Sequence, residues 1–300
     1  MIPETTAAPV RPFRSALYIP GSRPRAMEKA AGLDCDAIIF DLEDAVAPSE
    51  KDSARAGLLA ALAGTDYGGR FRLVRINGPE TPWAAADLAA LASREGYDAV
   101  LVPKVSAPGD LDRVAAVLPG VPLWAMMETI SGLFEARAIA AHPALAGMVM
   151  GTNDLQKEMG CRYRPDRLAM QTGLGLCLMA ARERGLVILD GVYNAFGDMA
   201  GLEAECVQGR DMGFDGKTLI HPAQLDTANA VFAPSAEEIA LAQRQIAAYD
   251  HAAAAGHGVA VLDGHIVENL HVVAARRVLG QAAAIAAMAR SEAGQERLVR

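Results

Sequence analysis

Two carboxylate residues, Glu128 and Asp154, stand where apolar stretches of the sequence end. Glu128 closes the run Leu123–Thr129, and Asp154 closes the run Gly147–Asp154. If these runs are neighbouring parallel strands, both carboxylates converge at one edge of the sheet. Mg²⁺ prefers such oxygen ligands, often one or two carboxylates completed by water and substrate oxygens. The pair therefore predicts a metal site. The alternative is that each residue caps a helix or forms a salt bridge, since Asp154 precedes a helical turn and Glu128 precedes Ser131.

One candidate, Arg75, lies near the end of the apolar run Phe71–Asn77. A buried guanidinium needs an anionic partner, which it binds best through two parallel hydrogen bonds. That partner is either a substrate carboxylate or an internal acid such as Asp41, Glu43 or Asp44. The residues alone leave these two alternatives open.

A third candidate is the glycine turn Pro20–Pro24, which follows the run Ser15–Pro20. A turn of this kind that leads into a helix can bind phosphate through backbone N–H groups, and Arg23, Arg25 and Lys29 add positive charge. The alternative is an ordinary loop with solvated basic residues. Without further context the residues favour the ordinary loop.

Eight apolar runs rich in strand-forming residues must position these side chains. They are Ser15–Pro20, Ala37–Asp44, Phe71–Asn77, Ala99–Val105, Leu123–Thr129, Gly147–Asp154, Leu186–Gly191 and Gly213–Pro222. Helical segments such as Trp83–Arg94, Ser131–Ala141 and Met199–Met212 lie between them. Strand and helix alternating eight times predict an α/β fold, the (β/α)₈ TIM barrel, with its active site at the carboxyl ends of the strands. His221, at the end of the eighth run, is expected to be structural rather than a general base.

The domain organisation that we expect has three parts. Residues 1–12 form a flexible N-terminal tail, residues 13–233 form the catalytic barrel, and residues 234–300 form an extension. In the extension, a long helix over Ser235–Ala255 opens with a capping box of Ser235 and Glu238. A hairpin around Asp263-Gly264 and a second helix over His271–Arg290 follow. A barrel does not need this extension, so it is a candidate lid or subunit contact.

The composition excludes several classes of function. A net charge of −8 argues against nucleic acid as a partner, because phosphate binding needs a dense basic surface. No uninterrupted apolar run approaches the roughly 18 residues that span a bilayer, and the N-terminus does not resemble a signal peptide. The four cysteines form no CxxC pair and are expected to be reduced thiols. A cytoplasmic protein that binds neither nucleic acid nor membrane is expected.

Several motifs in a fixed order carry a resemblance to a known family. They are PGSRPRAMEKA, IIFDLEDAVAPSEK, VRING, VPKV, MMET, MGTNDL and GKTLIHP. Together they resemble the HpcH/HpaI aldolase–citrate lyase superfamily, in the branch that is similar to the citrate lyase β-subunit and includes malyl-CoA lyases. The likeness runs from about Phe13 to Leu279. It implies a (β/α)₈ barrel with a C-terminal lid, assembled as a trimer or hexamer.

The resemblance also implies a role for each candidate residue. Glu128 and Asp154 match Mg²⁺ ligands, with Mn²⁺ as a substitute ion, and Arg75 matches the arginine that binds the acyl carboxylate or the thioester. Residues that match positions contacting coenzyme A are Tyr18, Arg23, Lys29, Ile220 and His221. The implied substrate is a CoA thioester, and Asp41, Glu43 and Asp44 are supporting acids. The phosphate-binding interpretation of the first loop becomes the stronger one.

One position departs from the lyases of the family. Their lid carries an Asp that acts on the neighbouring subunit, and here the matching residue is Glu268. The extra methylene displaces the carboxylate, and a shift of about an ångström can cost roughly 10² in rate. The strings at Arg162–Leu178, Asp190–Phe196 and Gly264–Val272 resemble a branch that hydrolyses (3S)-malyl-CoA to malate and CoA. That branch predicts a Mg²⁺-dependent thioesterase in which Glu268 of a neighbouring subunit activates water.

Two alternatives remain at this point. The first is a lyase that cleaves the C–C bond of malyl-CoA, β-methylmalyl-CoA or citramalyl-CoA to give glyoxylate or pyruvate and an acyl-CoA. The second is a citrate lyase β-like subunit that needs an acyl-carrier protein. The acyl group is not fixed by the sequence, because a single methyl group in a pocket changes selectivity only about 10–200-fold.

Overall fold

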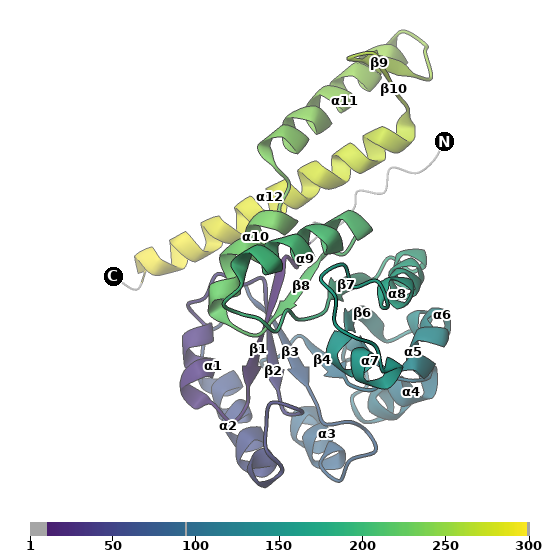
Figure 1. Cartoon of the computed structure of the whole chain (residues 1–300). Helices are drawn as coiled ribbons and strands as arrows, with labels where there is room; N and C mark the ends of the chain where they lie inside the picture. Colours follow the sequence, from purple (N-terminus) through teal and green to yellow (C-terminus); the bar gives the residue numbers. More distant parts are fainter. Residues whose placement is uncertain (1–10, 94, 299–300) are drawn as a thin grey trace. The chain divides into compact units, whose positions relative to one another are not determined.

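The chain folds around a closed barrel of eight parallel strands (Figure 1). The computed structural model describes residues 11–93 and 95–298, with side chains as far as residue 290, so most of the expected N-terminal tail (1–10) lies outside the described residues. The strands are β1 (Ser15–Pro20), β2 (Ala37–Asp41), β3 (Phe71–Arg75), β4 (Ala99–Val102), β5 (Leu123–Met127), β6 (Leu145–Met150), β7 (Val187–Asp190) and β8 (Gly216–Leu219). The predicted (β/α)₈ fold is confirmed.

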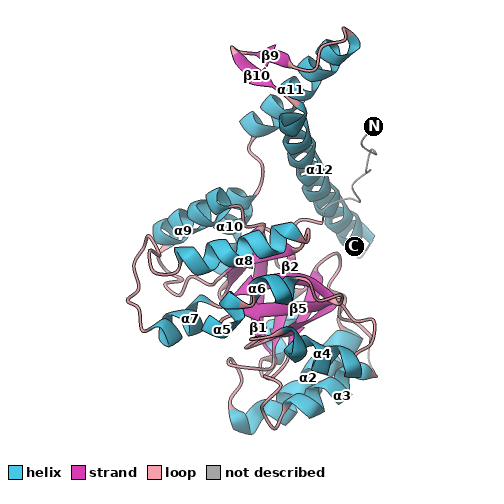
Figure 2. Cartoon of the chain, turned by 90° about the vertical axis from the view of Figure 1, so that its right-hand side faces the viewer, coloured by secondary structure: helices cyan, strands magenta, loops and turns pink. Residues whose placement is uncertain are grey.

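Helices connect the strands and cover the outside of the barrel (Figure 2). They are α1 (Pro24–Ala30), α2 (Lys51–Gly64), α3 (Ala84–Ala92), α4 (Pro108–Val117), α5 (Ile130–Phe134), α6 (Ala136–Ala140), α7 (Thr152–Met159), α8 (Gln171–Glu183), α9 (Met199–Met212) and α10 (Leu225–Phe232), with short 3₁₀ turns η1 (Pro48–Glu50) and η2 (Pro222–Gln224). The single helix expected over Ser131–Ala141 is wrong: α5 and α6 are separate, because the backbone at Glu135 leaves the helical conformation.

Alternation along the strands decides which side chains enter the barrel. The interior core is built from every second residue, as in Ala37 and Ile39 of β2 and Trp124 and Met126 of β5. Phe13, Phe71 and Trp124 pack together there, with ring centroids 5.2–5.9 Å apart. Gly147 leaves room for this packing, since a Cβ there would lie 2.6 Å from the Trp124 ring. The amino-terminal end of the barrel is therefore closed by aromatic rings.

The same alternation carries polar residues into the interior at the other end. Asp41 continues the inward positions of β2, Arg75 those of β3, and Glu128 those of β5. The register of the β2–β3 pair sets Asp41 directly beside Arg75. The barrel thus changes from an apolar core to a charged layer where the strands end, as expected for the catalytic face of this fold.

A second compact unit begins at Ala233, after the barrel unit Phe13–Phe232. It contains α11 (Ala236–Ala254), the hairpin β9 (Ala260–Leu262) and β10 (His265–Val267), and α12 (Asn269–Leu298). The capping box is confirmed: the Ser235 hydroxyl accepts from the N–H of Glu238, whose carboxylate accepts from the N–H of Ser235. Figure 2 shows β9 and β10 as the hairpin between the two helices.

Helix α12 has one further property. Its segment Asn269–Arg290 is long and apolar enough to cross a membrane by length and composition, with a mean hydropathy of 1.4. Arg276 and Arg277 interrupt its apolar run.

Candidate active site

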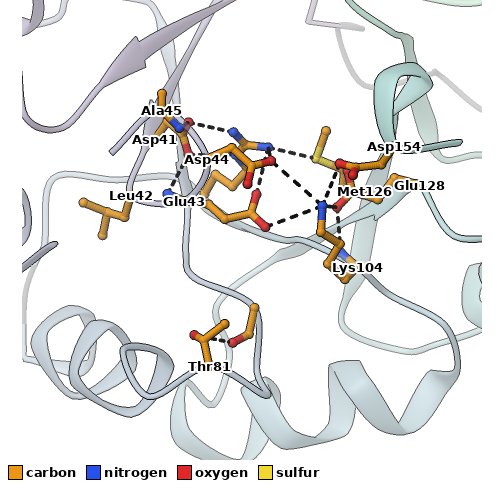
Figure 3. Close-up of polar contacts among 12 residues, drawn as sticks. Asp41, Leu42, Glu43, Asp44, Ala45, Thr81, Lys104, Met126, Glu128 and Asp154 are labelled. Atoms are coloured by element: carbon orange, nitrogen blue, oxygen red, sulfur yellow. Dashed lines mark hydrogen bonds and ion pairs between the residues drawn. The ribbon is translucent and has the colours of Figure 1, made fainter. Parts of the chain in front are cut away.

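The charged layer surrounds a cavity of about 310 Å³ at the carboxyl ends of the strands. Its lining includes Tyr18, Asp41, Asp44, Arg75, Met126, Glu128, Asp154 and Ile220. Seven of the charged residues in this region, here called the mouth cluster, are Asp41, Glu43, Asp44, Arg75, Lys104, Glu128 and Asp154 (Figure 3). They come from four different strand ends and the first turn of α7, so residues far apart in sequence form one site.

Arg75 is held by internal acids. Its Nε and Nη2 donate to the two carboxylate oxygens of Asp41, at 2.7 and 2.6 Å. Its Nη1 lies 2.9 Å from Glu43 Oε2, at an angle that makes no hydrogen bond. The guanidinium also lies 4.9 Å from the centre of the Tyr18 ring. Of the two alternatives that the sequence left open, the internal partner is present, and Arg75 still lines the cavity.

Asp41 is fixed as firmly as the arginine that it binds. Its carboxylate also accepts from the N–H groups of Glu43 (2.8 Å) and Ala45 (3.0 Å). Burial alone would raise the pKa of Asp41, but the charge and hydrogen bonds of Arg75 outweigh burial, and the pKa is lowered. Asp41 and Arg75 therefore form a rigid, charge-neutral base for the site.

Glu128 and Asp154 face each other across Lys104. Glu128 Oε1 accepts from the Lys104 N–H at 2.8 Å, and Asp154 Oδ2 accepts from Lys104 Nζ at 2.6 Å. The capping part of the alternative is wrong, because Thr129 caps α5 and Gly151 is the N-cap of α7. The salt bridges of the alternative are present, since both acids pair with Lys104. Asp154 lies inside the first turn of α7, where its charge suits the helix dipole.

Gly151 allows Glu128 to take its place. A Cβ on Gly151 would lie 2.4 Å from the Glu128 Cβ and 2.5 Å from its Oε2. No real side chain tolerates such contacts, so only glycine lets the backbone after β6 approach the carboxylate. Sequence reasoning did not single out this residue.

The mouth cluster holds more negative than positive charge. It contains five carboxylates but two cations, Arg75 and Lys104, which form its ion pairs. Burial raises the pKa of Glu43 to about 8 and that of Glu128 to about 7, against the lowering effect of Arg75 on the first and Lys104 on the second. An additional cation would relieve this imbalance. Within the described residues no group of three His, Cys, Asp or Glu could hold a metal, so an ion on Glu128 and Asp154 would need oxygens from water or substrate as well.

The other predicted site residues fall into three places. Tyr18 lines the cavity beside the mouth cluster, here called the mouth cavity, and its ring faces Arg75. Arg23 and Lys29, together with Arg25, border a separate open hollow of about 630 Å³. Ile220 lines the mouth cavity, and the ring of His221 stacks on Phe196 with centroids 4.9 Å apart. His221 Nδ1 accepts from the N–H of Ala223, which is the structural role expected of it.

Glu268 belongs to the C-terminal unit. It follows β10 and is exposed, and its N–H donates to His271 Nδ1 at 3.0 Å. Within the described part of this unit it directly precedes α12. It is not one of the residues of the mouth cluster, all of which belong to the barrel unit.

A second buried group of charges lies beside β7 and β8. Lys217 Nζ contacts Asp190 Oδ2 at 3.0 Å and Glu205 Oε1 at 2.7 Å. Arg167 Nη1 contacts both oxygens of Asp190, at 2.7 and 2.8 Å. We call these four residues the β7–β8 cluster. Sequence reasoning gave them no role, although a lysine inside an apolar strand was a usable signal that a buried acid faces it.

Comparisons with known proteins agree with this geometry. The family model described as HpcH/HpaI aldolase/citrate lyase matches residues 14–222. A (3S)-malyl-CoA thioesterase of Cereibacter sphaeroides is 67% identical over 92% of this chain and 96% of the relative. An L-malyl-CoA/β-methylmalyl-CoA lyase of the same species is 32% identical over 94% and 98%. The solved structure of the protein CitE from Mycobacterium tuberculosis, in complex with magnesium, acetoacetate and coenzyme A, superposes with a TM-score of 0.79 at 31% identity and covers 91% of this chain and 100% of its own.

Proposed function

Since the chain belongs to the HpcH/HpaI aldolase/citrate lyase family, we propose that it hydrolyses (3S)-malyl-CoA to (S)-malate and coenzyme A with the help of Mg²⁺. One observation carries the choice of reaction: identity to a (3S)-malyl-CoA thioesterase is 67%, whereas identity to a malyl-CoA lyase is 32% over a similar span. The thioesterase is thus much the nearer of these two relatives.

Glu128 and Asp154 are the residues that would hold the metal. The fit rests on the excess of carboxylates in the mouth cluster and on the two oxygens that already face one cation there. A solved relative at 31% identity contains magnesium, and Mn²⁺ suits the same oxygen ligands. When bound, the ion supplies Lewis-acid stabilisation of negative charge on substrate oxygens.

Arg75 and Tyr18 would orient the acyl group. Asp41 binds Nε and Nη2, whereas Nη1 donates to Met126 Sδ at 3.6 Å and lies 2.9 Å from Glu43. The second N–H of Nη1 is the one that would bind an anionic substrate oxygen. In this role Arg75 stabilises charge that develops on the thioester oxygen, and its fixed position means that little reorganisation is needed.

The hollow beside α1 would bind the phosphates of coenzyme A. Arg23, Arg25 and Lys29 border it, and guanidinium and ammonium groups are the side chains that bind phosphate best. Ile220 and His221, which directly follow β8, would contact coenzyme A closer to the cavity of the mouth cluster, which Ile220 lines.

Glu268 of a neighbouring subunit would be the general base, which makes the active enzyme a homo-oligomer, a trimer or hexamer. Its carboxylate takes a proton from water while the water oxygen bonds to the thioester carbon. The tetrahedral oxyanion then collapses, the C–S bond breaks, and the leaving coenzyme A thiolate takes up the proton that Glu268 removed from water. Base catalysis of this kind contributes about 10²–10⁴ in rate.

The experiment that tests the proposal follows two products at once. Purified protein is incubated with (3S)-malyl-CoA and Mg²⁺ while free thiol and glyoxylate are measured. Thiol without glyoxylate supports hydrolysis. Glyoxylate and acetyl-CoA without thiol would overturn it in favour of a lyase, and no reaction on any free CoA thioester would favour a subunit that needs a carrier protein.

A further inference from the structure

Lys104 holds both proposed metal ligands at once. It follows β4 with a φ of 55°, in the left-handed region that side-chain-bearing residues rarely adopt. This conformation directs its N–H to Glu128 and its side chain to Asp154. Such backbone strain persists only where the surroundings fix it, and it concentrates at functional sites.

The ammonium of Lys104 lies where a cation shared by Glu128 and Asp154 belongs. Its Nζ is 2.6 Å from Asp154 Oδ2 and 3.3 Å from Glu128 Oε1. On its other side it is 3.8 Å from Glu43 Oε1 and 3.9 Å from Asp44 Oδ2. Figure 3 shows this nitrogen between the two pairs of acids.

The two cations of the mouth cluster differ in their freedom to move. Arg75 has a side chain that is 7% exposed and is bound by two hydrogen bonds to Asp41. The Lys104 side chain is 40% exposed and is attached through a flexible four-carbon stem. Arg75 is therefore fixed, whereas the Lys104 ammonium can leave Asp154 and approach Glu43 and Asp44, which already lie within 4 Å of it.

We propose that Lys104 is a built-in competitor for the metal ion. Mg²⁺ binds carboxylate oxygens at about 2.0–2.1 Å, closer than an ammonium does, and repulsion prevents two cations from sharing the same oxygens of Asp154 and Glu128. Metal binding therefore displaces the ammonium toward Glu43 and Asp44. Lys104 weakens the binding of every cation to this site, and an ion with two charges displaces it better than one with a single charge. This inference rests on the proposed metal site.

The test measures metal affinity rather than turnover. Binding of Mn²⁺ is followed by electron paramagnetic resonance, in the absence of substrate, for the wild type, K104M, K104G and K104R. K104G keeps the left-handed backbone without strain. Removing the ammonium in K104M or K104G should tighten Mn²⁺ binding at least about tenfold, since the competing charge lies in direct contact with the ligands. K104R, which keeps the charge, should bind no more tightly than the wild type.

Two controls make the result decisive. K157M removes an exposed lysine from α7, the helix that carries Asp154, and should change affinity by less than about threefold, because solvent and salt screen an exposed charge. D154N should abolish binding. Unchanged or weaker binding in both K104M and K104G would overturn the inference while D154N still showed the metal site to be real. If D154N bound Mn²⁺ as the wild type does, the proposed metal site itself would fail.

Discussion

The barrel contains two groups of buried charges that differ in their balance. In the β7–β8 cluster, Lys217 and Arg167 face Asp190 and Glu205, and all four residues are at most 5% exposed. Burial opposes the charged form of each partner, yet Asp190 has a lowered pKa and Lys217 a raised one, because each compensates the other. A neutral group of this kind holds strands and helices together, and Arg167 and Glu205 also line a cavity of about 280 Å³.

The mouth cluster has the opposite character. Its carboxylates outnumber its cations. Burial raises the pKa values of Glu43 and Glu128, and neighbouring carboxylates add a smaller upward contribution. Both groups border a cavity, so the balance of charge is what separates them. The difference teaches that a buried charge cluster left unbalanced is arranged for a cation or substrate, whereas a balanced one is arranged for the fold.

Substitution of Asp154 should have the largest effect on activity. D154N removes a proposed metal ligand, and loss of several kcal/mol of charge stabilisation should lower kcat/KM about 10³-fold or more. The melting temperature should stay close to that of the wild type, because the mouth cluster has more carboxylates than cations and the loss of one negative charge reduces repulsion within it. D211N, an exposed change on α9, serves as the control for activity. Full activity in D154N would contradict the assignment.

Substitution of Lys217 should show the reverse pattern. K217M leaves Asp190 without one of its two cations in a fully buried site, which typically costs about 3–5 kcal/mol of folding free energy. K104M, in the mouth cluster, should change stability by about 1 kcal/mol or less, because its partly exposed charge is screened. Urea unfolding of both variants measures the contrast, and equal costs would abolish the distinction between the two clusters.

Gly151 offers a test of position rather than of charge. G151A would force its Cβ against Glu128, and a displacement of about an ångström in a catalytic group can lower the rate about 10²-fold. In G175A, an alanine in α8 meets nothing within 4 Å, so that variant should be fully active and no less stable than the wild type. Steady-state kinetics and thermal melts of the two variants give the comparison. Equal activity of G151A and G175A would show that catalysis does not depend on the position of Glu128 beside Gly151.

Much of the barrel and its polar edge could be predicted from the sequence. Continuous apolar runs identified the strands, and the residues after them identified Glu128, Asp154 and Arg75, because strand alternation and chain direction are local properties. The partners of these residues are not local. Lys104 reaches Asp154 across 50 positions, and Lys217 reaches Asp190 across 27. The break between α5 and α6 also escaped prediction, since the segment Ser131–Ala141 has helical spacing throughout.

A final expected effect concerns pH and would sharpen the comparison further. Burial, opposed by Arg75, raises the pKa of Glu43 to about 8, above the value of about 4.3 in an unfolded chain. The folded state therefore holds an extra proton between these two values, and the free energy of unfolding should fall as pH rises from about 5 to about 8. E43Q removes this proton uptake, so its stability should fall less steeply over the same range than that of the wild type. Urea unfolding at three pH values in a chelating buffer measures both slopes. Identical slopes would mean that Glu43 is ionised over the whole range. The extra proton of the mouth cluster would then be held by another of its carboxylates.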